Sequence, residues 1–161
     1  MSYDGSYGLI STDDHVIEPA NVWDGRLEAK YQDRAPRVMQ VDGEERWVFE
    51  KRKLVNVGLA AMAGKKYEDY TPAALRFSDM LPGCYDPKER LLDMDRDGVE
   101  AQILFPSAPG MAGQVFAEAD DKDLALACVR AYNDWMIEEW CGDSGGRLIP
   151  LCISPMWDPQ L

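Results

Sequence analysis

Histidine is almost absent from this sequence, and two familiar targeting features are missing. Only His15 occurs among the 161 residues, so these residues cannot hold a site built from several histidines. No apolar run reaches the roughly 18 residues that a membrane-spanning helix requires. The first residues carry no positive segment followed by an apolar core, which is the pattern of a secretory signal. We therefore expect no membrane partner and a cytoplasmic protein.

Basic residues and paired cysteines are also scarce. Lys and Arg number 17 against 29 Asp and Glu, which gives a formal net charge of −12. A surface of that sign repels phosphate backbones, so nucleic acid is not an expected partner. The four cysteines show no C-x-x-C spacing of the kind found in zinc and redox pairs. Cys128 and Cys152 have apolar neighbours and are expected to be buried free thiols in a reducing compartment.

The remaining composition is that of an ordinary globular domain. Hydrophobic residues make up 46% and charged residues 29% of the chain, a mixture that can bury a core. The first predicted strand covers about residues 7–13. A β-hairpin is predicted where residues 37–41 and 46–50 flank an Asp-Gly dipeptide. A short helix is expected between residues 56 and 66.

The second half of the sequence alternates between strand and helix patterns. Asp86 is a predicted N-cap followed by Pro87 at the first helical position, and Gly98 is expected to end that helix. The expected elements are a helix over about 86–97, a strand over 100–105, a helix over about 120–141 and a strand over 147–153. This order predicts an α/β fold with a parallel sheet. Three such strands are too few to close a barrel.

Asp13 and His15 are the candidate metal ligands. Side chains alternate along a strand, so these two share one face while Asp14 points the other way. A carboxylate and an imidazole on one face can bind a divalent transition metal. Two protein ligands do not make a tight zinc site, however. From spacing alone, the alternative is an ordinary hydrogen-bonded pair in a loop.

Other residues carry weaker expectations. Glu18 is expected to form a salt bridge or to contact a helix start rather than to bind metal. The loop 107–113 is expected on the catalytic face, either shaping a pocket or serving as a plain connection. Asn133 is expected to have a packing or capping role. Trp135 and Trp140 are five residues apart and therefore need not share a helix face, with one expected in the core and the other at an interface.

Residues 10–19 resemble the opening strand of the amidohydrolase-related family, which includes enzymes similar to aminocarboxymuconate semialdehyde decarboxylase. Further resemblance lies in residues 86–106, 131–135 and 147–150. The resemblance implies the N-terminal part of a (β/α)8 TIM barrel spanning residues 1–161. Its first strand would be followed by a hairpin-containing insertion over about 19–85 and by βα units over about 86–161.

The same resemblance implies a metal site and an enzyme class. Asp13 and His15 match the metal-binding pair of the family, with zinc as the first expectation and manganese as the second. The implied activity is hydrolysis of C–N or C–O bonds, or non-oxidative decarboxylation of a small organic acid. The family draws further ligands from later strands, so the chain is expected to be a fragment that lacks them. The alternative is a truncated non-catalytic product, or a barrel half that needs a partner chain.

The sequence assigns neither a catalytic residue beyond these ligands nor a substrate-binding residue. The expected partner is a small-molecule substrate. Self-association into a homo-oligomer stays open, because the insertion after the first strand can serve equally as a subunit contact or as a lid.

Overall fold

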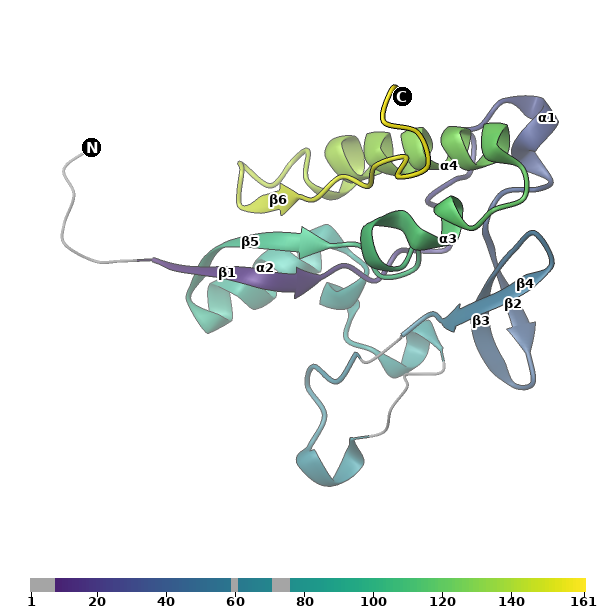
Figure 1. Ribbon diagram of the computed structural model, residues 1–161. Coiled ribbons are helices and arrows are strands. Elements are labelled where there is room, and N and C mark those ends of the chain that lie inside the picture. Colours follow the sequence, from purple (N-terminus) through teal and green to yellow (C-terminus); the bar gives the residue numbers. More distant parts are fainter. Residues whose placement is uncertain (1–7, 59–60, 71–75) are drawn as a thin grey trace.

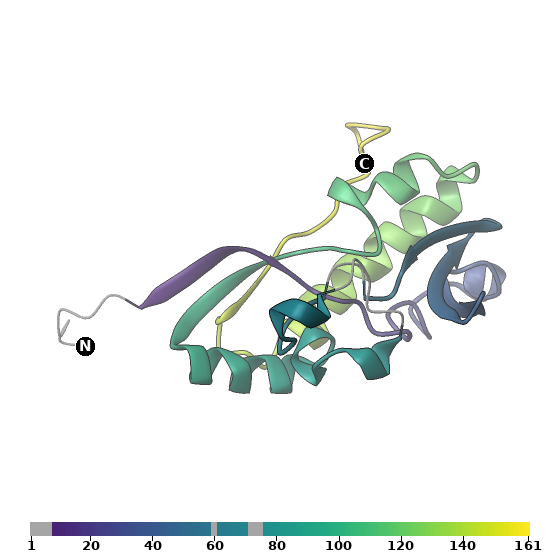
Figure 2. The same cartoon turned by 90° about the horizontal axis from the view of Figure 1, so that it is seen from below.

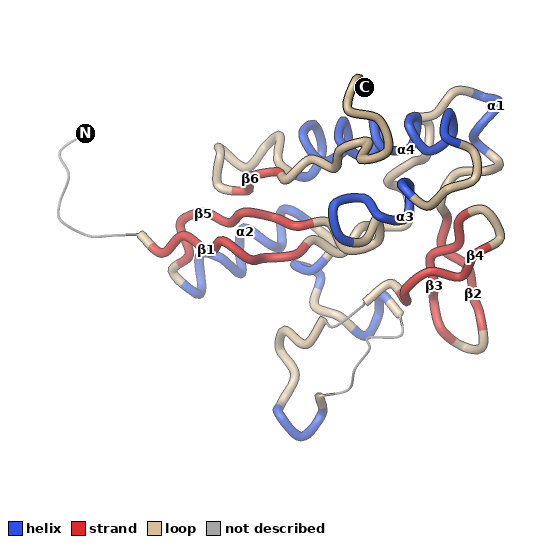
Figure 3. Tube along the Cα trace, in the orientation of Figure 1, coloured by secondary structure: helices blue, strands red, loops and turns tan. Residues whose placement is uncertain are grey.

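The protein contains two three-stranded sheets and a small set of helices in the computed structural model, which describes residues 8–58, 61–70 and 76–161. The parallel sheet has the order β1-β5-β6, with β1 Leu9–His15, β5 Val99–Phe105 and β6 Leu148–Pro150. The antiparallel sheet has the order β2-β3-β4, with β2 Arg37–Val41, β3 Glu44–Phe49 and β4 Arg52–Asn56. Figure 3 shows the two sheets as separate groups of strands.

Two longer helices accompany the parallel strands. The α-helices are α1 Ala29–Gln32, α2 Pro87–Asp97, α3 Gln114–Ala117 and α4 Lys122–Trp135, and a π-helical turn over Met136–Trp140 extends α4. Short 3-10 turns cover Tyr67–Asp69, Phe77–Asp79, Pro82–Cys84 and Met111–Gly113. In the described part of the chain, no helix has the length and apolar character needed to cross a membrane.

The predicted α/β alternation is confirmed. Strands β1, β5 and β6 point the same way, with α2 and α4 running alongside them (Figures 1 and 2). Helix α2 begins and ends as its capping residues predict. The Asp86 carboxylate accepts the main-chain N–H groups of Lys88 and Glu89, at 2.8 and 3.2 Å. Gly98 closes the helix in the left-handed conformation at φ 69°.

The antiparallel sheet lies beyond the carboxyl ends of β1 and β5, where both views of the ribbon place it. Its inner face joins an aromatic core with residues from other segments. The ring centroids of Trp23 and Trp47 are 5.2 Å apart, and those of Trp23 and Phe116 are 6.1 Å apart, both edge to face. The Trp23 indole also donates to the Cys128 carbonyl at 3.1 Å. The insertion is thus packed against α4 at this end of the parallel sheet.

Several local expectations are corrected. Strand β1 extends to His15, so both candidate ligands lie within it. Residues 52–56 form a third antiparallel strand that was not expected. The short helix expected over 56–66 does not form: residue 56 ends β4, residues 57–58 and 61–66 are turn or irregular, and 59–60 lie outside the described residues. Cys128 is buried as expected, but Cys152 is exposed.

The two tryptophans at the end of α4 also differ from expectation. Trp135 and Trp140 are both buried, and their ring centroids are 5.9 Å apart. The π-helical turn explains the contact, because its hydrogen bond from Cys141 N–H to the Met136 carbonyl spans five residues. The π-helical turn thereby brings two residues that are five positions apart onto the same side of the helix. In a regular α-helix these two residues would point in different directions.

Candidate metal centre

The side chains at the end of β1 divide between two faces of the parallel sheet. Asp14 is paired in register with Leu104, which is fully buried, and His15 is paired with Phe105, which is 36% exposed. Because register partners in adjacent strands present their side chains to the same face, Asp14 faces the buried side and His15 the open side. The His15 and Phe105 ring centroids are 5.7 Å apart on the open side.

Asp13 lies at an irregularity of the β1–β5 pairing. Between Ser11 and Asp14, β1 advances by three residues while β5 advances by two, from Gln102 to Leu104. Such a bulge re-aims side chains locally and is common beside functional sites. Asp13 and His15 are both exposed. Within the described residues, neither the Asp13 carboxylate nor the His15 imidazole takes part in a hydrogen bond or an ion pair.

The main chain around His15 is fastened to three neighbouring segments. Val16 N–H donates to the Phe105 carbonyl at 3.0 Å, which continues the pairing with β5. Ile17 N–H donates to the Cys84 carbonyl at 3.0 Å, in the turn that precedes α2. Arg90 on α2 donates from Nη2 to the His15 carbonyl at 3.0 Å. The main chain at the candidate ligand is therefore hydrogen-bonded to β5, to the turn before α2 and to α2 itself.

Arg90 makes this attachment from a partly buried position. Its guanidinium also donates to the Gly83 carbonyl at 2.5 Å and to Gln102 Oε1 at 3.2 Å. Burial lowers the pKa of Arg90, which opposing negative charges, including that of Asp14, partly offset. Arg90, Asp14 and Gln102 line one cavity of about 220 Å³, together with Asp93. This cavity is on the side of the sheet away from the candidate ligands.

The surroundings of Glu18 differ from the expected salt bridge or contact with a helix start. It forms neither a salt bridge nor a contact with a helix start among the described residues, and it is 1% exposed. Its two carboxylate oxygens accept the N–H groups of Ser107 and Ala108 at 2.9 and 2.8 Å. Tyr132 of α4 donates to the same carboxylate at 3.0 Å. Burial raises the pKa of the Glu18 carboxyl, although these hydrogen bonds act in the opposite direction.

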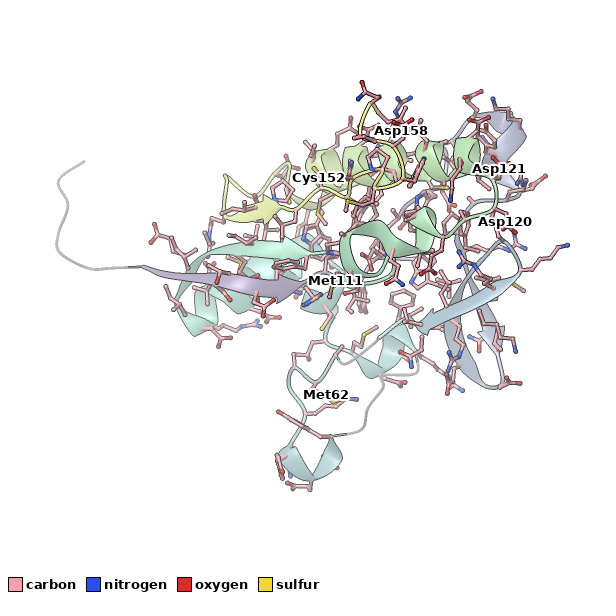
Figure 4. The ribbon with its side chains drawn as sticks, viewed as in Figure 1. Met62, Met111, Asp120, Asp121, Cys152 and Asp158 are labelled. Atoms are coloured by element: carbon pink, nitrogen blue, oxygen red, sulfur yellow. The ribbon has the colours of Figure 1, made fainter. Side chains whose placement is uncertain are left out.

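The loop that Glu18 holds follows directly on β5. Because His15 pairs with the last residue of β5, the loop starts beside the candidate ligand. Gly110 adopts φ 72° and ψ −179°, a region essentially restricted to glycine, and Ala112 adopts φ 53°. Between them Met111 is 87% exposed. Figure 4 labels Met111 on this loop, and the place of the loop on a catalytic face stays a prediction.

The donor types at the end of β1 fit a divalent transition metal. Asp13 supplies a carboxylate and His15 an imidazole, and both side chains are accessible. Among the described residues, however, no group of three or more His, Cys, Asp or Glu side chains is placed to bind a metal ion. The described residues thus offer two candidate ligands, fewer than a tight site requires.

Asn133 meets its expectation of a packing role. Its side-chain amide donates to the Ile153 carbonyl and accepts from the Ile153 N–H, both at 2.9 Å. This pair ties α4 to the segment that follows β6. A larger depression of about 900 Å³ lies between the ends of α1 and β3 and the start of α4, and neither Asp13 nor His15 lines it.

Comparisons with known proteins concern the family and the fold of the chain. A family model described as amidohydrolase matches residues 18–161, a range that begins just after Asp13 and His15. Among the 13 matching chains of solved structures is an amidohydrolase from Mycobacterium avium subsp. paratuberculosis K-10, with a TM-score of 0.63 and 21% sequence identity. The aligned part covers 91% of this chain and 42% of that one. At this identity the likeness shows the fold alone.

No curated protein matches the sequence. The chain spans less than half the length of the solved amidohydrolase, since it covers 42% of it. The family match nonetheless extends over most of the residues, from just after β1 to Leu161. The chain therefore belongs to the amidohydrolase family.

Proposed function

We propose that this chain is part of a metal-dependent enzyme in which Asp13 and His15 bind one divalent cation, with zinc as the first choice and manganese as the alternative. The observation that carries the proposal is the end of β1, where two accessible donor side chains stand on a fastened main chain. In barrels of parallel strands, reactive groups gather at the carboxyl ends of the strands. A bound cation there would polarise a substrate oxygen or acidify a water molecule.

The proposed reaction is hydrolysis of a C–N or C–O bond, or loss of carboxylate from a small organic acid. Both reactions would give the described residues the same roles. Asp13 and His15 hold the cation, and the loop 107–113 contacts the small-molecule substrate beside it. Membership of the amidohydrolase family supports the hydrolytic alternative. The remaining ligands would come from outside the described residues.

The single histidine gives this proposal a direct test. Because His15 is the only imidazole in the chain, its side-chain NMR signals need no assignment. Titration with Zn²⁺ alone should shift these signals saturably, at one zinc per chain. His15→Gln should remove these signals, which confirms their origin. Asp13→Asn keeps the imidazole and should weaken the zinc affinity read from its signals at least tenfold, because it removes one of the two candidate ligands.

Asp14→Asn is the matched control, since it changes the neighbouring carboxylate on the opposite face. This variant should bind zinc more tightly than Asp13→Asn does. Imidazole signals that do not respond to zinc in the unaltered chain would falsify the proposed site. Equal zinc affinity in Asp13→Asn and the unaltered chain would remove Asp13 from it.

A further inference from the structure

We infer that Arg90 is a positioning residue for the candidate ligand His15. It fastens the main chain at the end of β1 to β5 and to the turn before α2. The inference rests on the proposed metal site and adds to it a residue from a helix on the far side of the sheet. Arg90 touches neither the imidazole nor the open face, so its effect is exerted through the strand.

The three hydrogen bonds of Arg90 go to three different segments. Nη2 donates to the His15 carbonyl at 3.0 Å in β1. Nη1 donates to Gln102 Oε1 at 3.2 Å in β5, and Nε donates to the Gly83 carbonyl at 2.5 Å. A planar guanidinium presents its donors in a fixed fork, so the three acceptors are held at fixed relative positions. A lysine ammonium at the end of a flexible stem cannot reproduce this geometry.

Asp14, next to His15, lies near Arg90 without a hydrogen bond or ion pair between them among the described residues. The Asp14 Oδ2 atom is buried and has no hydrogen-bond partner among the described residues. Arg90 and Asp14 line the same cavity, where the positive charge of Arg90 offsets this carboxylate. Removing the arginine would take this positive charge away from the half-buried Asp14 carboxylate. The end of β1 would then relax where the ligands are mounted.

Arg147 offers a matched control at the opposite end of β5. It donates to the carbonyl groups of Glu100 and Val99 at 3.0 and 2.9 Å, and it pairs with Asp95 at 2.7 Å. Arg147 therefore makes main-chain contacts like those of Arg90, but at the amino end of the strand. Its loss should destabilise the sheet without reaching His15.

The experiment compares Arg90→Met, Arg90→Lys and Arg147→Met in the full chain. Thermal unfolding should show a lower Tm for both methionine variants. The side-chain NMR signals of His15 in the metal-free protein should move in Arg90→Met and stay in place in Arg147→Met. Zinc affinity should fall about tenfold in Arg90→Met, at the lower end of effects seen for residues that support metal ligands. Arg90→Lys keeps the charge but lacks the planar fork of donors. Its imidazole signals and its zinc affinity should lie between those of the unaltered chain and those of Arg90→Met.

Two outcomes would overturn the inference. One is a folded Arg90→Met protein whose imidazole signals and zinc affinity equal those of the unaltered chain. The other applies if Arg90→Met does not fold: unchanged imidazole signals in Arg90→Lys then count against positioning. If zinc leaves the unaltered imidazole unmoved, the proposed function fails. The metal-free comparison of Arg90→Met with Arg147→Met still decides the role of Arg90.

Discussion

The Tyr132 hydroxyl donates a 3.0 Å hydrogen bond to the Glu18 carboxylate, which lies 114 positions earlier in the chain. Both residues are almost fully buried, at 0% and 1% exposure. The bond joins α4 to the segment that follows β1. Together with the contact of Arg90, it fixes this segment from both helices that accompany the parallel strands.

Tyr132→Phe tests the energetic weight of this bond. The substitution removes one donor from a buried carboxylate, and losing a partner of a buried charged group costs roughly 1–3 kcal/mol. We expect a loss of that size in the free energy of urea unfolding. Tyr70→Phe changes a hydroxyl on a side chain that is 54% exposed and should have no measurable effect. Equal stability of the two variants would show that the phenol bond is not stabilising.

Glu18 predicts a pH dependence of stability. Burial raises the pKa of its carboxyl above the ordinary value of 4.5, so the folded state retains this proton to higher pH than the unfolded state. Below pH 4.5 the full stabilising effect of that proton is present, and it is lost as the pH rises toward the folded pKa. The stability difference between the unaltered chain and Glu18→Gln should therefore shrink as the pH rises above 4.5. Urea unfolding across this range measures it, and a difference that grows with pH would contradict the direction of the shift.

Alanine substitutions at Gly98 and Gly142 distinguish the cost of backbone strain from the cost of a steric clash. An added Cβ at Gly98 would meet no atom within 4 Å, so Gly98→Ala pays only for the positive φ of 69°. That cost is about 1–2 kcal/mol. At Gly142 the added Cβ would lie 2.2 Å from the main-chain oxygen of Glu138. Gly142→Ala should therefore lose more stability than Gly98→Ala in chemical denaturation, and the reverse order would show that the turn after α4 yields easily.

Thiol reactivity should distinguish the cysteines. Cys152 is exposed, whereas Cys84, Cys128 and Cys141 are buried. Burial raises the pKa of both Cys128 and Cys141 to about 12, which leaves almost no reactive thiolate near neutral pH. A maleimide reagent should label Cys152 first in the folded protein, as peptide mass spectrometry would reveal. Labelling of all four thiols at one rate would indicate that the folded state opens readily.

Helix α2 was predictable because its signals are local. The N-cap at Asp86, the proline after it and the terminal glycine at 98 all lie within one helix length of sequence. Strand β5 was predictable for the same reason, whereas the strand expected over 147–153 forms only at Leu148–Pro150. The parallel sheet followed from their alternation with helices. The candidate ligands followed from the period of a single strand together with a family resemblance.

The hydrogen bonds that hold the main chain around the candidate site could not be predicted from local sequence patterns. Arg90 and the His15 carbonyl are 75 positions apart, and no periodic pattern connects them. Glu18 stands beside a proline and looks like a surface carboxylate, but its partners are main-chain groups that the fold alone brings near. The π-helical turn at the end of α4 was missed because α-helical spacing separates the two tryptophans that it stacks.

β1 and β5 are adjacent in the sheet but far apart in the sequence, and this has a consequence for the order of folding. Leu9 pairs with Val99, 90 positions away (99 − 9), whereas Gln102 pairs with Leu148, 46 positions away (148 − 102). Doubling a loop adds about 0.6 kcal/mol of closure entropy, and non-local pairing slows folding. Strand β1 should therefore dock after β5 and β6 have met, a sequence that pulsed hydrogen exchange would resolve. Of the three parallel strands described, the one that carries Asp13 and His15 would then join last, and the His15 ring would reach its place beside Phe105 only in that step.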